Sequence, residues 1–159
     1  MAPIGGVFLA AVGATLIVGG FIPRFRQRSI WIGFAMGVIF VTIFEGRLLL
    51  PPPPTGVQLG ALALAVAVEV AAFAALLPRL HLAGERAVVA GTLAIVGSHF
   101  VLMLPALGPA IGVLGGLCTA NALILWRSPR YPLGKGWAID GAIKVALGAF
   151  MIASFPGFD

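Results

Sequence analysis

Residues 57–77 read VQLGALALAVAVEVAAFAALL, and this stretch decides the fold class. It is apolar over the length of a helix that crosses a ~30 Å hydrocarbon core, which takes about 20 residues. Its one charged residue, Glu69, lies near the middle. A charge at that depth is costly in hydrocarbon, so it should face a partner, a cavity or a pathway. The stretch therefore predicts a membrane-spanning helix that carries one residue with a special role.

Further apolar stretches of similar length lie on both sides of this one. Together they predict an all-α, polytopic membrane bundle of six transmembrane helices, which form a single domain over residues 1–159. The expected spans are residues 4–22, 30–50, 57–77, 87–107, 109–126 and 137–155. We expect Pro78 to end the third span, and the four prolines at 51–54 to form a stiff loop, because proline cannot continue a helix.

The composition excludes an ordinary water-soluble domain. The chain is 60% hydrophobic and 9% charged, whereas soluble domains average about 45–50% apolar and about 25% charged residues. The net charge of +5 does not indicate nucleic-acid binding, because the basic residues lie in short loops between apolar runs. The single cysteine, Cys118, cannot form an intrachain disulfide.

Lys and Arg occur in alternate loops. The loops after the first, third and fifth expected spans are basic, whereas those after the second and fourth contain no Lys or Arg. The basic loop residues are Arg24, Arg26, Arg28, Arg79, Arg86, Arg127, Arg130 and Lys135. Basic loops stay in the cytoplasm, so we predict a multi-pass protein of the plasma (inner) membrane with both termini extracytoplasmic. Trp31, Trp126 and Trp137 then lie at the cytoplasmic ends, where interfacial aromatic residues are common.

Six spans also divide into two sets of three, the second of which is inverted. Residues 13–23 (GATLIVGGFIP) and 90–105 (AGTLAIVGSHFVLMLP) share TL, IVG and F, which favours a 3+3 inverted repeat, a common plan of transporters. The pairs Gly33/Gly37 and Gly112/Gly116 have the GxxxG spacing. This spacing predicts close helix packing, either inside one bundle or between the protomers of a homo-oligomer.

Glu69 and His99 are the leading candidates for a functional site, and neither has a charged partner on its own helix. Their spans are joined by a short loop, so we expect antiparallel neighbours with an axial offset of ~6 Å between the two residues. A Glu–His pair explains how both residues tolerate the membrane, and it can exchange a proton near neutral pH. The alternative is that each side chain is neutral and makes one structural hydrogen bond.

Four further polar residues within the expected spans are candidates for a role. Asp140 and Lys144 are spaced i, i+4 with the acid first, the better orientation for an ion pair within a helix. We favour a self-neutralising structural pair, with a role in transport as the alternative. Asn121 lies at similar depth and is expected to join a polar cluster on the cytoplasmic side. Glu45 is a candidate either for an external mouth or for an interfacial anchor.

No catalytic template is present: the chain has no HExxH, GxSxG, P-loop or CxxC motif, and it has two histidines. The sequence therefore indicates no cofactor and no metal, and it favours a protein that is not an enzyme. We expect a transporter or channel that links a small solute or ion to protons, with Glu69 and His99 at a midplane site. The alternative is a non-catalytic membrane component: a partner subunit, an assembly factor, or a protein that binds a lipid or another apolar ligand.

Overall fold

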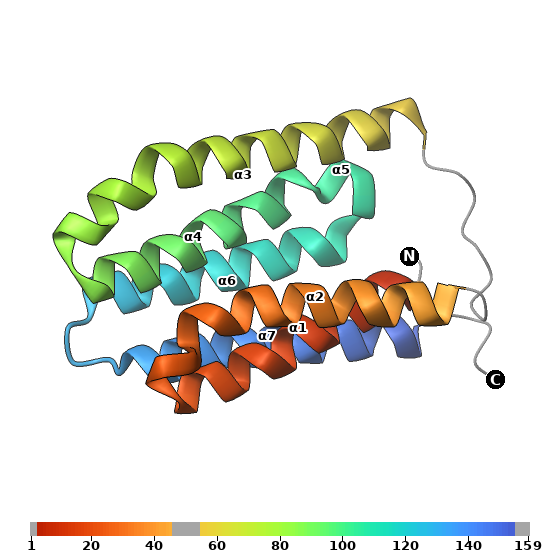
Figure 1. Cartoon of the computed structure of the whole chain (residues 1–159). Coiled ribbons are helices and arrows are strands. Elements are labelled where there is room, and N and C mark those ends of the chain that lie inside the picture. The colour runs from red at the N-terminus through yellow and green to blue at the C-terminus, as the bar shows by residue number, and fades with distance from the viewer. Residues whose placement is uncertain (1–2, 46–54, 155–159) are drawn as a thin grey trace. The chain divides into compact units, whose positions relative to one another are not determined.

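The computed structural model describes residues 3–45 and 55–154, and the side chains of residues 5–43 and 55–154. In this part of the chain every regular element is a helix (Figure 1). The helices are α1 (Pro3–Phe21), α2 (Arg26–Glu45), α3 (Gly56–Ala83), α4 (Glu85–Leu102), α5 (Leu104–Leu107), α6 (Pro109–Arg127) and α7 (Leu133–Ala153), and the 3₁₀ turn η1 (Pro23–Phe25) precedes α2. The all-α prediction is confirmed, and the expected proline loop at 51–54 lies outside the described residues.

Four of the described helices, α3, α4, α6 and α7, are long and apolar enough to cross a membrane. The apolar part of α1, Gly5–Phe21, is slightly shorter, and α2 begins with Arg26, Gln27 and Arg28, which lower its hydropathy. Many large apolar side chains of these helices are exposed. Extended apolar surfaces of this kind suit contact with lipid tails rather than with water. The structure therefore supports a helical membrane protein.

The third predicted span is longer than expected, because Pro78 does not end it. α3 continues through Pro78 to Ala83. A proline inside a helix removes one backbone donor and crowds the preceding turn. In this helix the guanidinium group of Arg79 donates to the carbonyl of Ala75 at 2.8 Å. The carbonyl that loses its backbone donor is that of Ala74, four residues before the proline, and the helix nevertheless continues to Ala83.

Gly84 and Gly108 each turn the chain within a single residue. Their φ angles are 100° and 85°, in the left-handed region that glycine adopts freely and that strains a residue with a Cβ atom. Gly84 joins α3 to α4, and Gly108 joins α5 to α6. Pro109 is the first residue of α6, as predicted from the preference of proline for that position.

The described helices form two compact units. The first unit contains α1, α2 and α7 from Trp137 onward, and the second contains α3, α4, α5 and α6. α3 and α4 belong to the same unit, so this grouping differs from the division that a 3+3 repeat would produce. The repeat and the single domain remain predictions.

Glycines allow the helices of the first unit to approach each other closely. A Cβ atom at Gly141 of α7 would lie 2.5 Å from the carbonyl oxygen of Gly13 on α1, and a Cβ atom at Gly148 would lie 2.5 Å from that of Gly6. Real Cβ atoms do not come so near a backbone oxygen. Close packing of α1 on α7 therefore requires glycine at these positions.

The predicted Gly33/Gly37 pair lies on α2 and faces α1. A Cβ atom at Gly33 would meet the hydroxyl group of Thr15, and a Cβ atom at Gly37 would meet the ring of Phe8. Both glycines are buried in this contact. The chain therefore uses this small-residue face for packing inside the first unit.

α4 and α6 form the core of the second unit. A Cβ atom at Gly115 of α6 would lie 2.7 Å from the carbonyl oxygen of Gly97 on α4, and Leu114 is fully buried. α3 packs against α4 (Figure 1) but is largely exposed, with Ala65 as its one buried residue. Of the four described helices that are long and apolar enough to cross a membrane, the one that carries Glu69 is therefore the least buried.

Candidate functional site

Glu69 of α3 and His99 of α4 are in contact in the second unit, as the sequence predicts. Oε2 of Glu69 lies 2.5 Å from Nδ1 of His99. His99 Nδ1 has no hydrogen-bond partner among the described residues, so the contact is an ion pair when the imidazole is protonated. The Glu69 side chain is 22% exposed and the His99 side chain 11%. The pair is therefore shielded but still partly accessible.

The single-residue turn at Gly84 brings the two residues to the same level. Each lies fifteen residues from Gly84 along its helix, which at 1.5 Å per residue puts both about 22 Å from the turn. The expected axial offset of ~6 Å is therefore wrong. The expected offset was calculated with a third span that ends at Leu77 and a fourth that begins at Ala87. In the structure α3 continues to Ala83 and α4 begins at Glu85, so that Gly84 alone separates them.

α4 ends three residues after His99. Pro105 has no backbone N–H with which to continue the helix, so α4 stops at Leu102 and the short α5 begins at Leu104. The N–H of Met103 still donates to the carbonyl of His99 at 3.1 Å. Membrane transporters commonly place their binding sites at interrupted helices of this kind.

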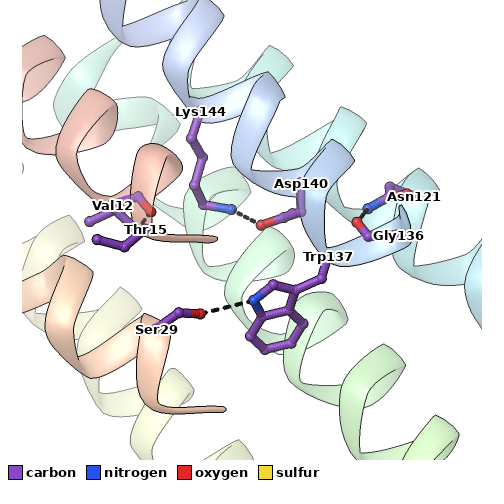
Figure 2. Close-up of polar contacts among 8 residues, drawn as sticks. All are labelled: Val12, Thr15, Ser29, Asn121, Gly136, Trp137, Asp140 and Lys144. Carbon is purple, nitrogen blue, oxygen red and sulfur yellow. Dashed lines mark hydrogen bonds and ion pairs between the residues drawn. The ribbon is translucent and has the colours of Figure 1, made fainter. Parts of the chain in front are cut away.

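Asp140 and Lys144 form the predicted i, i+4 ion pair on α7, in the first unit (Figure 2). Nζ of Lys144 contacts Oδ2 of Asp140, and both side chains are 1% exposed. The second carboxylate oxygen, Oδ1, is buried and has no hydrogen-bond partner among the described residues. Desolvation offsets much of the Coulomb attraction in a buried pair. The arrangement buries both charges inside the protein, and the choice between a structural pair and a role in transport stays a prediction.

Trp137 is buried inside the first unit, and its position at the cytoplasmic end of a span stays a prediction. Its indole Nε1–H donates to Oγ of Ser29 on α2 at 3.0 Å (Figure 2). A Cβ atom at Gly19 of α1 would lie 3.1 Å from the same nitrogen. Three helices meet at this hydrogen bond, which explains the burial of the indole. Trp31 and Trp126 are exposed, as expected.

Asn121 is buried on α6, and its Nδ2 donates to the carbonyl of Gly136 at 2.8 Å (Figure 2). This hydrogen bond ties α6 to the first residues of α7. The expected polar cluster around Asn121 and Asp140 stays a prediction. Glu45 is the last residue of α2, and its side chain lies outside the described part of the chain.

Arg86, at the start of α4, has a role that its sequence context did not reveal. Its Nη1 donates to the carbonyls of Leu125 at 2.8 Å and Ser128 at 3.0 Å. Its Nη2 donates to those of Pro129 at 2.7 Å and Tyr131 at 2.9 Å. One guanidinium group thus satisfies four carbonyls at the end of α6 and in the following turn. Backbone carbonyls carry no sequence signal, so these contacts were not predictable.

Gln58 caps the start of α3 and also links α3 to α5, and the sequence contained a signal for the cap alone. Thr55 and Gln58 form a capping box, in which the N–H of Thr55 donates to Oε1 of Gln58 at 2.8 Å and the N–H of Gln58 donates to Oγ1 of Thr55 at 3.3 Å. The T-x-x-Q pattern is a known mark of a helix start. Nε2 of the same amide donates to the carbonyl of Ala106 at 3.2 Å, which holds α5 on α3.

Among the described residues, His, Cys, Asp and Glu side chains form no group of three or more that could hold a metal ion. Comparisons with protein-family models, with curated proteins and with solved structures found no match to this chain.

Proposed function

We propose that the protein is a small proton-linked transporter or channel for a small solute or an ion, with Glu69 and His99 as its proton-exchange site. The observation that carries this proposal is the contact between an acid and an imidazole on two helices of membrane-spanning length. An ionisable residue inside a membrane is costly and usually has a function. Histidine changes its charge near neutral pH more readily than other side chains.

The chemistry of the pair suits proton exchange inside a membrane. With one proton between them, Glu69 and His99 have no net charge, whether the imidazole is protonated or the carboxyl is. A second proton gives the site a net positive charge, and loss of the proton leaves it negative. Each change alters the attraction for a charged solute, because charges interact strongly where water is scarce. In this proposal, proton binding and solute binding are coupled at one site.

Access to the pair is supported by two features of the second unit. Both side chains are partly exposed, and α4 ends at Leu102, three residues after His99. The other polar residues within the expected spans are candidates for further positions along a pathway, and their participation is part of the proposal: Glu45, Asn121, Asp140 and Lys144.

We also propose that all six long helices cross the plasma (inner) membrane, with both termini outside the cytoplasm. The apolar length of α1 and the apolar part of α2 after Arg28 support two spans beyond the four that length and composition select. The alternation of basic loops supports the orientation. The 3+3 inverted repeat belongs to the same proposal, and the likeness of residues 13–23 to 90–105 supports it.

A non-catalytic membrane component is the second candidate function. The observation that favours it is the exposed apolar surface of α3, where Ala65 is the one buried residue. Such a surface suits a helix of a partner subunit, or a lipid or another apolar ligand. In this case Glu69 and His99 only neutralise each other.

Self-association through a small-residue face is part of the proposal, and the open space beside Gly116 on α6 supports that face. Gly33 and Gly37 already pack against α1, and Gly112 faces the side chain of Leu104. A Cβ atom at Gly116 would have no neighbour within 4 Å. A contact between protomers would therefore use the side of α6 around Gly116.

Proton flux through the full chain in liposomes tests the proposed function. A pH-sensitive dye trapped inside should report faster collapse of a pH gradient than in protein-free liposomes. Glu69→Gln and His99→Gln should slow the collapse, since an amide cannot exchange a proton in this way. His81→Gln is the matched control, because His81 is an exposed histidine in the last turn of α3. Its flux should equal that of the parent.

Equal flux in Glu69→Gln and the parent would rule out proton exchange at this pair. A folded parent protein that gives no flux above protein-free liposomes, in the presence of a range of solutes, would favour the non-catalytic component instead.

A further inference from the structure

Residues 126–136, at one end of the second unit, contain several positively charged side chains. Arg127, Arg130 and Lys135 are all exposed, and the segment contains no Asp or Glu. We propose that this segment binds the headgroup of an anionic phospholipid, with its phosphate as the group that is recognised. The proposal does not depend on the role of Glu69 and His99.

The position of the segment favours a lipid over a soluble phosphate as the ligand. α6 is long and apolar enough to cross a membrane, and it exposes Leu123 and Ile124 close to its end. Trp126 follows and is 49% exposed, as is typical of tryptophan at the boundary between membrane and water. The basic residues come directly after it, so they lie at the level of the headgroups.

Arg86 holds the segment in one shape before any ligand binds. Its guanidinium group donates to four carbonyls between Leu125 and Tyr131. Pro129 and Pro132 restrict the backbone further. A segment that is already ordered loses little conformational entropy when a ligand binds. The turn therefore presents Arg127 and Arg130 in a defined arrangement, and Arg86 acts on the site only by positioning it.

The chemistry of the three basic side chains favours an anionic headgroup over a zwitterionic one. Arginine binds two phosphate oxygens at once through its planar guanidinium group. Nζ of Lys135 lies 6.0 Å from the centre of the Tyr131 ring, at the outer limit of a cation–π contact. Phosphatidylcholine has the same phosphate but also a compensating ammonium group. Phosphatidylglycerol lacks that group, so we expect it to bind more tightly.

Native mass spectrometry of the full chain in detergent tests the proposal, with dioleoyl phosphatidylglycerol and dioleoyl phosphatidylcholine as probes. The parent should bind phosphatidylglycerol roughly ten-fold more tightly than phosphatidylcholine. Arg127→Gln/Arg130→Gln should weaken phosphatidylglycerol binding by roughly 10- to 30-fold. Arg24→Gln/Arg28→Gln is the matched control, because it removes two exposed arginines outside the segment, and its affinity should remain close to that of the parent.

Thermal unfolding in the same detergent checks that both double variants are folded like the parent. If both double variants lost the same affinity for phosphatidylglycerol, the effect would be one of general charge, and the proposed lipid site would be rejected. Equal affinity of the parent for the two lipids would overturn it as well. Displacement of phosphatidylglycerol by inorganic phosphate at a similar concentration would identify a soluble-phosphate site and reject the lipid.

Discussion

Glu69 and His99 lie at equal distances from Gly84 along two antiparallel helices, and their side chains meet at 2.5 Å. This relationship requires α3 to continue through Pro78, as it does in the structure. A helix that ended at Pro78 would be followed by a longer loop and would shift the two residues out of level. The contact is therefore a property of the whole α3–α4 hairpin rather than of the two side chains alone.

The free energies of unfolding of Glu69 and His99 variants should be coupled. Removal of one partner leaves the other without its counter-charge in apolar surroundings. We expect Glu69→Ala and His99→Ala each to destabilise the detergent-solubilised protein, and the double variant to recover part of the loss. The coupling free energy should be about 0.5–3 kcal/mol in a double-mutant cycle. The control pair Glu69→Ala and His81→Ala should be additive, and additivity in the first cycle would contradict the pairing.

Cysteine labelling at the two ends of α3 should show opposite sides of the membrane. Gly56 has open space beside it, and Leu82 is 91% exposed. α3 has 28 residues, about 42 Å at 1.5 Å per residue, which exceeds the hydrocarbon core. A membrane-impermeant maleimide added to intact cells should label Gly56→Cys. It should label Leu82→Cys only after the membrane is opened.

The parent chain is the control for this labelling, because its one cysteine, Cys118, is fully buried. The reverse pattern would invert the proposed orientation. Labelling of both positions from outside would show that α3 does not cross the membrane.

Gln58→Glu should separate two functions of one side chain. A glutamate still accepts the N–H of Thr55, so the capping box remains. A carboxylate cannot donate to the carbonyl of Ala106, so the link from α3 to α5 is lost. We expect a loss of about 1 kcal/mol in stability and faster hydrogen exchange of the amides of residues 104 and 106–108. Unchanged exchange in these amides would show that Gln58 does not hold α5.

Arg86→Lys should destabilise the protein although the charge is kept. An ammonium group on a flexible chain cannot match a planar guanidinium that bonds four separate carbonyls. We expect a loss of about 1.5–3 kcal/mol in thermal or denaturant unfolding, with faster hydrogen exchange in residues 128–131. Arg24→Lys, an exposed control, should change stability by less than about 0.5 kcal/mol. A similar small effect at Arg86 would contradict its role.

Gly141→Ala should destabilise the protein, whereas Gly116→Ala should not. A Cβ atom at Gly141 would lie 2.5 Å from the carbonyl oxygen of Gly13, so α1 and α7 must move apart. Overpacking of this kind costs about 1–3 kcal/mol. A Cβ atom at Gly116 meets nothing within 4 Å, so the higher helix propensity of alanine should leave stability unchanged or raise it by up to about 1 kcal/mol. Equal effects on the unfolding temperature would contradict the close α1–α7 packing.

Local patterns in the sequence predicted the contacts that one helix or one hairpin can form. Asp140 and Lys144 pair because an i, i+4 spacing puts two side chains on one face of any helix. Glu69 and His99 were expected to be neighbours because their helices are consecutive and antiparallel. The axial level of that contact was predicted wrongly, because the prediction ended the helix at Pro78 whereas α3 continues to Ala83.

The sequence by itself determined that the chain is helical and apolar and where its intramembrane charges lie, because the length of an apolar run and the cost of a charge in it depend on residue type alone. Only the tertiary structure decided the roles of Arg86, Gln58 and Trp137. Arg86 and Gln58 bind backbone carbonyls of distant residues, and every residue has a carbonyl. Trp137 is buried because Ser29 and Gly19 meet it from two other helices. Such contacts depend on which helices pack against each other, and the spacing of residues within one segment does not predict that.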